Sequence, residues 1–417
     1  MKKLIGYLFL ITMVVVCSGK TFAWDDSGHK LVAYIAWEQM SPQVREKVIN
    51  ILMNAPEDSQ IMAFYPTPVD ADFSTYPIGA RSKEAKQRDF FMVMAYWCDV
   101  VRERKYEKRY KYHHGNWHYL DTLWREVNGK VEVVKDENPD KENAVERLFY
   151  FDKVLKDSSA KDAEKAIALA WILHLTGDIH QPLHASGRLT AEDPKGGDQG
   201  GNTFSLSPKD APRKENLHWF WDSIVVRTVA RKNDMSDAEY LLPIAQKMMK
   251  KYPLAKMQSR LENEQFDKWQ NESFQIASTK LYPSTLKRGE MPSAAYNKMA
   301  FGIAEEQIAL AGYRLGTMLN QIFGQNNAVA SNDEIPCKII RKVHYPVTQT
   351  QPSSQPLEIG LLNLCPADKG MMQRPMYPFM KNGKVIDREY DVERIFKTEK
   401  EAREYAEKNG IKDISIN

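Results

Sequence analysis

Residues 170–185 read A-W-I-L-H-L-T-G-D-I-H-Q-P-L-H-A, and this stretch organises the prediction for the whole chain. Residues 167–173 are apolar on every side, which is typical of a helix buried in a protein interior. His174 and Asp178 are four residues apart, so a helix places them on one face. A bound cation would satisfy both buried groups, although a hydrogen-bonded His–Asp pair is the simpler alternative for an isolated pair. The following proline ends the helix and leaves His184 on a turn that can fold back toward the same point.

The composition indicates a large folded protein with an export signal. The chain has 417 residues, of which 43% are hydrophobic, enough for one big domain or for a domain with an appendage. Its net charge of +3 is too small to indicate a nucleic-acid or membrane partner. Residues 1–23 predict a secretory signal peptide, because two lysines precede an apolar run and the segment ends in T-F-A, a small-residue cleavage site. The apolar run is short for a membrane span. We therefore expect a periplasmic or secreted protein with no stable membrane insertion after signal cleavage.

Processing at this point would change the chemistry of the new first residue. Cleavage after Ala23 makes Trp24 the amino terminus, five residues before His29. A free α-amine and the adjacent carbonyl can chelate a metal ion together. Of the four cysteines, Cys17 leaves with the signal, and the odd number that remains excludes a disulfide scaffold. Cys337 and Cys365 can still pair in an oxidising compartment.

The periodicity of the remaining chain predicts an all-α body over residues 24–323. Helical spacing opens at Ser41 and recurs over residues 90–104, 142–155, 162–179, 216–230, 237–251, 266–279 and 296–322. No sustained alternation of period two precedes residue 325, which favours the all-α class. The glycine-rich loop around G-G-N at 200–202 is predicted either as a flexible connector or as part of a site rim.

The composition shifts in residues 324–417, which predict a linker and a small C-terminal α/β extension of unknown role. Residues 326–356 are rich in Pro, Ser, Gln and Thr, as linkers are. K-N-G-K at 381–384 is a hairpin signal. A capping box at residue 398 predicts a helix through residue 408.

Histidines and acids recur along the body at spacings that suit metal ligation. His218 and Asp222 repeat the four-residue spacing, and Asp99 and His118 each follow a tryptophan closely. Imidazole and carboxylate without cysteine form the donor set that zinc accepts in catalytic sites. The third member of the H-x3-D-x-H pattern, His180, falls on another face of the helix and is predicted to be structural.

Taken in order, these motifs carry a resemblance. The set W-x4-H, W-x-D, W-H-x-x-D, H-x3-D-x-x-Q-P-L-H, G-G-N and N-L-H-x3-D resembles the single-strand-specific zinc nucleases of the mung bean type, which share an α-helical fold with the bacterial zinc phospholipases C. The resemblance spans residues 24–323. Each motif alone is weak, but their occurrence in this order from a predicted cleavage site is specific.

The resemblance implies three zinc ions and nine protein ligands. The first zinc would be held by Asp99, His118, His174 and Asp178; the second by the amine and carbonyl of Trp24, by His29 and by Asp178 as a bridge; the third by His184, His218 and Asp222.

Further residues receive implied roles in catalysis or substrate binding. Asp121 would orient or activate the nucleophile, and an indirect role beside a ligand histidine is its alternative. Arg102 resembles the phosphate-contacting arginine of the family, with a salt bridge as its alternative. Tyr119 could stack on an unpaired base or simply fill the core. Asn202 is a candidate substrate-binding residue or a plain turn residue.

Three functions follow from these predictions. The first is an exported zinc endonuclease that hydrolyses single-stranded RNA and DNA to 5′-nucleotides and also removes 3′-phosphates from nucleotides. The second is a zinc-dependent phospholipase C; Asp222, where those enzymes resemble one another in using glutamate, favours the nuclease. The third is a non-enzymatic zinc-bearing surface protein, which the retained Asp121 and Arg102 disfavour.

Overall fold

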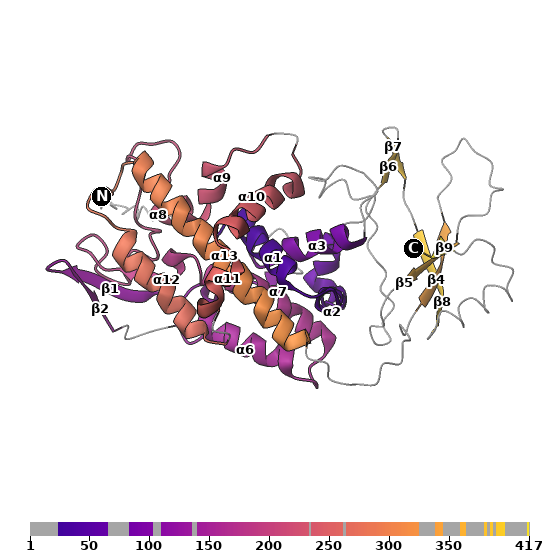
Figure 1. The fold of residues 1–417 in the computed structure, drawn as a ribbon. Helices are drawn as coiled ribbons and strands as arrows, with labels where there is room; N and C mark the ends of the chain where they lie inside the picture. Colours follow the sequence, from indigo (N-terminus) through magenta and orange to yellow (C-terminus); the bar gives the residue numbers. More distant parts are fainter. Residues whose placement is uncertain are drawn as a thin grey trace, which may run out of the picture.

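The computed structural model describes residues 24–65, 83–102, 110–135, 140–232, 235–261 and 264–324, together with the backbone of six short strands beyond residue 337 (Figure 1). The predicted signal peptide, Cys337, Cys365 and the predicted helix at 398–408 lie outside the described residues. The body is mostly helical, which confirms the predicted fold class.

Helix α7 (Asp162–Asp178) runs through the centre of this body. It contacts α6 on one side and α1, α2 and α13 on others, and every residue from Ala168 to Asp178 is buried. The Glu164 carboxylate accepts a hydrogen bond from the Lys161 backbone N–H at 3.2 Å and so caps the first turn. The all-round apolar sequence of this helix therefore predicted its burial correctly.

The other helices surround α7. They are α1 (Asp26–Gln39), α2 (Pro42–Met53), α3 (Lys83–Met94), α4 (Trp97–Val100), α6 (Ala144–Lys156), α8 (Leu217–Asp222), α9 (Ile224–Thr228), α10 (Asp237–Lys251), α11 (Leu254–Met257), α12 (Phe266–Lys280) and α13 (Ala294–Gly324). Two predicted helices are each divided: residues 90–104 contain the end of α3 and the short α4, and residues 216–230 contain α8 and α9.

Helix α1 was not predicted, and its packing explains why. All residues from Ser27 to Trp37 are buried, so its sequence shows no polar face. It lies against the long helix α13 (Figure 1). The two helices approach closely because Gly312 and Gly316 of α13 have no side chain at the contact. A Cβ on Gly312 would lie only 2.5 Å from Ile35 Cβ, and one on Gly316 only 2.7 Å from Gln39 Cβ. This contact fixes α1, and with it His29, inside the body.

A small sheet interrupts the helical body and was also not predicted. Its strands are β1 (Thr122–Val127), β2 (Lys130–Val133) and β3 (Ser186–Arg188), in the order β2-β1-β3. β1 and β3 pair in parallel with Thr122 opposite Ser186. The β1–β3 pairing joins segments far apart in sequence, so no local alternation signals it, whereas the β1–β2 hairpin turns at Asn128-Gly129, a local signal that the prediction overlooked. The β1–β3 pairing holds the segment after His118 beside the turn that carries His184, and the Leu120 N–H donates to His184 O at 3.0 Å.

The C-terminal extension contains β4 (Lys338–His344), β5 (Ile359–Asn363), β6 (Phe379–Lys381), β7 (Lys384–Ile386), β8 (Glu389–Phe396) and β9 (Ser415–Ile416). β8, β4, β5 and β9 form one sheet in that order, and β6 pairs with β7. The hairpin prediction is confirmed, since Lys381 pairs with Lys384. β4 lies within the predicted linker, whose proline and serine content concealed a short β-branched run. Among the described residues, no helix has both the length and the apolar character that crossing a bilayer requires.

Candidate metal centre

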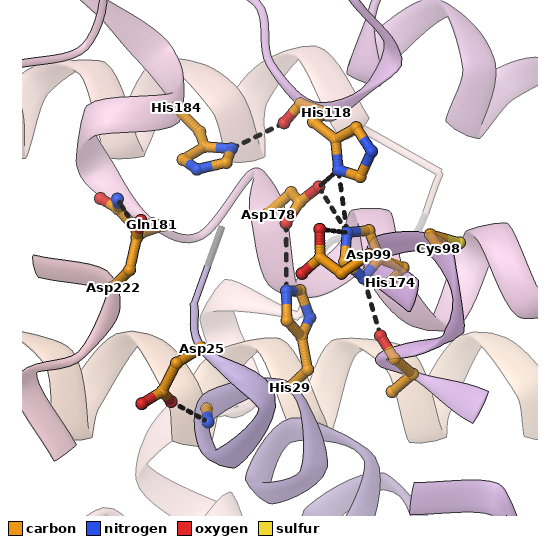
Figure 2. A network of polar contacts seen from close by, with 12 residues as sticks. Asp25, His29, Cys98, Asp99, His118, His174, Asp178, Gln181, His184 and Asp222 are labelled. Carbon is orange, nitrogen blue, oxygen red and sulfur yellow. Dashed lines mark hydrogen bonds and ion pairs between the residues drawn. The ribbon is translucent and has the colours of Figure 1, made fainter. Parts of the chain in front are cut away.

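Three groups of histidine and aspartate side chains meet in the interior of the body. Figure 2 shows the first two groups and, of the third, His184 and Asp222. Within each group, one potential ligand atom from every member lies within 4.8 Å of the others. The groups are His29, His174 and Asp178; Asp99, His118 and His174; and His184, His218 and Asp222. The first two share His174, so they form one continuous cluster. The structure thus brings together eight of the nine residues predicted as ligands.

These side chains come from segments that are distant in sequence. His29 lies on α1 and Asp99 on α4, while His118 ends the 3-10 helix Gly115–His118. α7 supplies His174 and Asp178 near its carboxyl end. The 3-10 helix Pro182–Ala185 supplies His184, and α8 supplies His218 and Asp222. The proline after α7 redirects the chain as predicted, although His184 joins the group on α8 rather than the pair on α7.

Asp178 is placed to serve two neighbouring sites at once. Its Oδ1 lies 3.3 Å from His29 Nε2, whereas its Oδ2 lies 3.0 Å from His118 Nδ1 and 3.2 Å from His174 Nε2. Each carboxylate oxygen therefore faces a different group of imidazoles. A carboxylate in this position is suited to bridge two cations.

Backbone carbonyls determine which histidine nitrogen faces the centre. Nδ1 of His174 lies 2.7 Å from Ala95 O, Nδ1 of His184 lies 2.7 Å from His118 O, and Nδ1 of His218 lies 2.7 Å from Gly200 O. A carbonyl oxygen only accepts, so each Nδ1 carries the proton and donates. In the neutral ring Nε2 is then unprotonated, and its lone pair points toward the cluster. This is the usual arrangement of a metal-ligating histidine.

Several buried polar atoms of the cluster have no hydrogen bond. Among the described residues these include Asp99 Oδ2, His118 Nε2 and Asp222 Oδ2. Buried carboxylate oxygens without a donor are costly in a folded protein. A bound cation removes this cost, and zinc suits a set of imidazoles and carboxylates without thiolate. The residues present therefore fit a zinc centre.

The electrostatics of the cluster agree with cation binding. Burial lowers the pKa of His29 to about 4 and that of His118 to about 3, so both rings are neutral at pH 7. Burial opposes the ionisation of Asp178, but His174 and the hydrogen bonds from the surrounding imidazoles hold its pKa well below the usual range. Burial raises the pKa of Asp222 well above its usual value.

Two glycines make room for the ligands: Gly177, whose role the sequence did not indicate, and Gly200 of the G-G-N loop. A Cβ on Gly177 in α7 would lie 2.6 Å from His29 Nδ1, so this position must lack a side chain for the His29 ring to fit. Gly200 has a φ of +63°, which favours glycine, and a Cβ there would lie 2.4 Å from Leu183 O. Its carbonyl accepts the His218 proton. The G-G-N loop is therefore a support for His218 rather than only a connector.

The remaining predicted site residues lie at or near this cluster. Trp24 is fully buried, and the next residue donates its backbone N–H to Asp222 O at 2.9 Å. Arg102 forms an ion pair with Asp99, and burial lowers its pKa. Asp121 lies between His118 and β1 and is partly buried. The roles predicted for these three residues stay predictions.

The two candidate substrate-binding residues differ in their surroundings. Tyr119 is 37% exposed, so its ring is accessible for stacking. The Asn202 amide donates to Gln199 O at 2.8 Å within its own turn. That contact favours the alternative in which Asn202 is a turn residue.

The other described histidines lie apart from the three groups. His180 donates from Nδ1 to Thr176 O at 2.7 Å, and its Nε2 accepts from Arg314 at 2.8 Å. This fully buried pair links the turn after α7 to α13 and agrees with the structural role predicted for His180. His114 stacks on Trp117 at 3.6 Å between ring centroids.

Comparison with known proteins identifies the family. The profile of the S1/P1 nuclease family matches residues 24–324. The chain belongs to the S1/P1 nuclease family. It is 23% identical to Endonuclease 1 of Arabidopsis thaliana over 345 residues, 78% of this chain and 95% of that protein. It is 22% identical to Nuclease P1 of Penicillium citrinum over 323 residues, 73% of this chain and 100% of that protein.

Membership of the S1/P1 family confirms the resemblance found in the sequence. It supports a hydrolase that acts on nucleic acid, and zinc is the metal that this family uses. The three buried groups of the centre are consistent with that metal.

Proposed function

We propose that this protein is an exported zinc-dependent endonuclease that hydrolyses single-stranded RNA and DNA to 5′-nucleotides and also removes 3′-phosphates from nucleotides. The observation that carries the proposal is the convergence of three buried His/Asp groups whose histidine lone pairs point inward, in a chain of the S1/P1 family. The body of residues 24–323 would carry the activity, and the extension beyond it has no assigned role.

Three zinc ions would be held by the side chains of the three groups, with Asp178 shared between two ions and the Trp24 amine as an added ligand. When bound, zinc supplies a Lewis acid and lowers the pKa of water toward neutrality. The carbonyl-bound Nδ1 protons keep the ligand imidazoles oriented. A dry, preoriented set of ligands needs no rearrangement as charge develops on the phosphate.

The residues around the metal centre would bind the substrate. Arg102 is positioned beside Asp99 and would pair with a phosphate oxygen of the scissile group. Tyr119 would stack on a base, which a single strand offers and a duplex hides. Asp121 would accept a hydrogen bond from the attacking water and hold it in line with the leaving 3′ oxygen.

The decisive experiment compares substrates. Purified protein that begins at Trp24 is incubated with denatured DNA, RNA, a 3′-mononucleotide and phosphatidylcholine, and the products are separated. We expect 5′-nucleotides from both nucleic acids and inorganic phosphate from the mononucleotide. Cleavage of the lipid without cleavage of nucleic acid would replace the proposal with a phospholipase C. Bound zinc without hydrolysis of any substrate would favour a non-enzymatic surface protein.

A second experiment tests export and the amine ligand together. The amino terminus of protein recovered from the periplasm or medium is sequenced, and its zinc content is compared with that of a form carrying extra residues before Trp24. We expect processing after Ala23 and a lower zinc content in the extended form. Equal zinc content and equal activity in the two forms would contradict a role for the Trp24 amine.

A further inference from the structure

Gln181 connects the turn after α7 to the last group of the metal centre (Figure 2). Its side chain is fully buried and has two hydrogen bonds. Oε1 accepts from the Leu183 backbone N–H at 2.7 Å, and Nε2 donates to Asp222 Oδ1 at 2.7 Å. One side chain therefore contacts both the segment that carries His184 and the carboxylate on α8.

The first of these contacts fixes the orientation of the amide. A backbone N–H can only donate, so the amide atom facing Leu183 must be the oxygen. The amide nitrogen then necessarily faces Asp222 and presents a donor. A flipped amide would place two donors against each other at Leu183 and two acceptors against each other at Asp222. The network thus permits one arrangement only.

The second contact makes the two oxygens of Asp222 different. Oδ1 accepts the hydrogen bond from Gln181, whereas Oδ2 has no hydrogen bond and lies 3.5 Å from His218 Nε2. Oδ2 is also the oxygen that turns toward the His218 side of the group. The donor on Gln181 therefore selects which oxygen is presented, and it restrains rotation of the carboxylate.

We propose that Gln181 is a positioning residue for the zinc ion held by His184, His218 and Asp222: it orients the Asp222 carboxylate so that Oδ2 faces the metal. This inference rests on the proposed function, because it assumes that zinc occupies the third group. Hydrogen-bond partners of this kind change the metal affinity of a site by about 10–100-fold when they are removed.

The test measures zinc binding site by site in the full mature protein. Gln181→Met keeps the length of the side chain and removes both polar atoms. Gln307→Met is the matched control. Gln307 lies on α13, away from the three groups, is also buried, and donates a hydrogen bond to His180 O at 3.3 Å. Zinc is titrated against a competing chelator, and total metal is measured by mass spectrometry.

We expect Gln181→Met to bind one of its three zinc ions about 10–100-fold more weakly, with the other two unchanged. Gln307→Met should bind all three as the unmodified protein does. Unchanged affinity at every site in Gln181→Met, or an equal loss at all three sites, would overturn the proposal. If the unmodified protein itself holds fewer than three zinc ions, the proposed function fails instead, so the two failures are distinguishable.

A second variant decides the question if Gln181→Met does not fold. Gln181→Glu keeps an acceptor for the Leu183 N–H, which preserves the turn, but replaces the amide N–H that faces Asp222 with a second carboxyl oxygen. That oxygen either repels Asp222 as a carboxylate or, when the two groups share a proton, donates a shorter O–H bond, and both cases change the position of the Asp222 carboxylate. The protein is loaded with Co²⁺, whose visible absorption reports ligand geometry. We expect the signal of one cobalt site to change and the other two to remain. A spectrum identical to that of the unmodified protein would refute the positioning role.

Discussion

A single methyl group on α7 should disable the metal centre. In Gly177→Ala the added Cβ would lie 2.6 Å from His29 Nδ1, which is 0.8 Å inside the 3.4 Å at which ordinary contacts begin. The His29 ring cannot retreat easily, because it stacks on His174 at 4.0 Å between centroids. Metal–ligand distances tolerate only about 0.2 Å of change. A displaced His29 therefore ceases to be a ligand.

The size of the effect follows from this displacement. A misplacement of about 1 Å at a reacting centre lowers turnover by roughly 100-fold, equivalent to about 2.7 kcal/mol in activation free energy. We expect Gly177→Ala to lose one zinc ion and to show about this decrease in kcat/KM on denatured DNA. Overpacking should lower the free energy of unfolding by about 1–3 kcal/mol, partly offset by the higher helix propensity of alanine.

A matched control separates the two contributions. Gly302 also lies within a helix, α13, and a Cβ there would meet no atom within 4 Å. Gly302→Ala should therefore raise the free energy of unfolding by about 0.5–1 kcal/mol and leave zinc content and turnover unchanged. Zinc is measured by mass spectrometry and stability by urea unfolding. Full zinc content and normal turnover in Gly177→Ala would refute the assignment of His29 as a ligand.

Three further results are expected. Removal of zinc with a chelator should abolish hydrolysis and lower the melting temperature, and added zinc should restore both; activity that persists without metal, measured on denatured DNA, would contradict the proposed function. In the metal-free protein, the folded pKa of His29, about 4, lies below its unfolded value of 6.5, so the unfolded chain takes up the proton first. The contribution of neutral His29 to the free energy of unfolding, which is complete above pH 6.5, should therefore decrease by about 3 kcal/mol as the pH falls to 4. Urea unfolding of His29→Asn should show a pH-dependent loss that is smaller by this amount. Arg314→Met should lower the free energy of unfolding by about 3 kcal/mol, because it leaves the buried His180 Nε2 without its donor and removes one of the two arginines that pair with Glu272. Arg125→Met, in the exposed ion pair with Glu132, should change it by less than about 1 kcal/mol; equal effects in the two variants would show that the buried cluster adds nothing.

Much of the helical body could be predicted from local sequence, and the exceptions share a physical cause. α10 begins and ends where its periodicity indicated, because its apolar face and its serine cap are both local signals. α1 has no such face, since its whole surface is buried. The β1–β3 pairing depends on a partner about 60 residues away and leaves no trace in either strand.

The candidate site was predictable as a set of residues but not as an arrangement. The spacing of His174 and Asp178 placed both on one face of a helix, and the structure agrees. The contributions of Gly177 and Gln181 could not be read from sequence, because they depend on contacts with His29 and Asp222 from distant segments. Short motifs thus reveal which side chains react, while the atoms that hold them in place become visible only in three dimensions.

The wide separation of the ligands along the chain has a consequence for how the protein matures. The segments that meet at the centre begin at α1 and end at α8, so a growing polypeptide cannot complete the zinc-binding groups before Asp222 has been synthesised. Truncated products that stop earlier would have an incomplete third group and would lack the backbone carbonyl that receives the Asp25 N–H. Binding of the full complement of ions therefore requires the chain through Asp222, and no fragment from the amino-terminal half should be able to hold it.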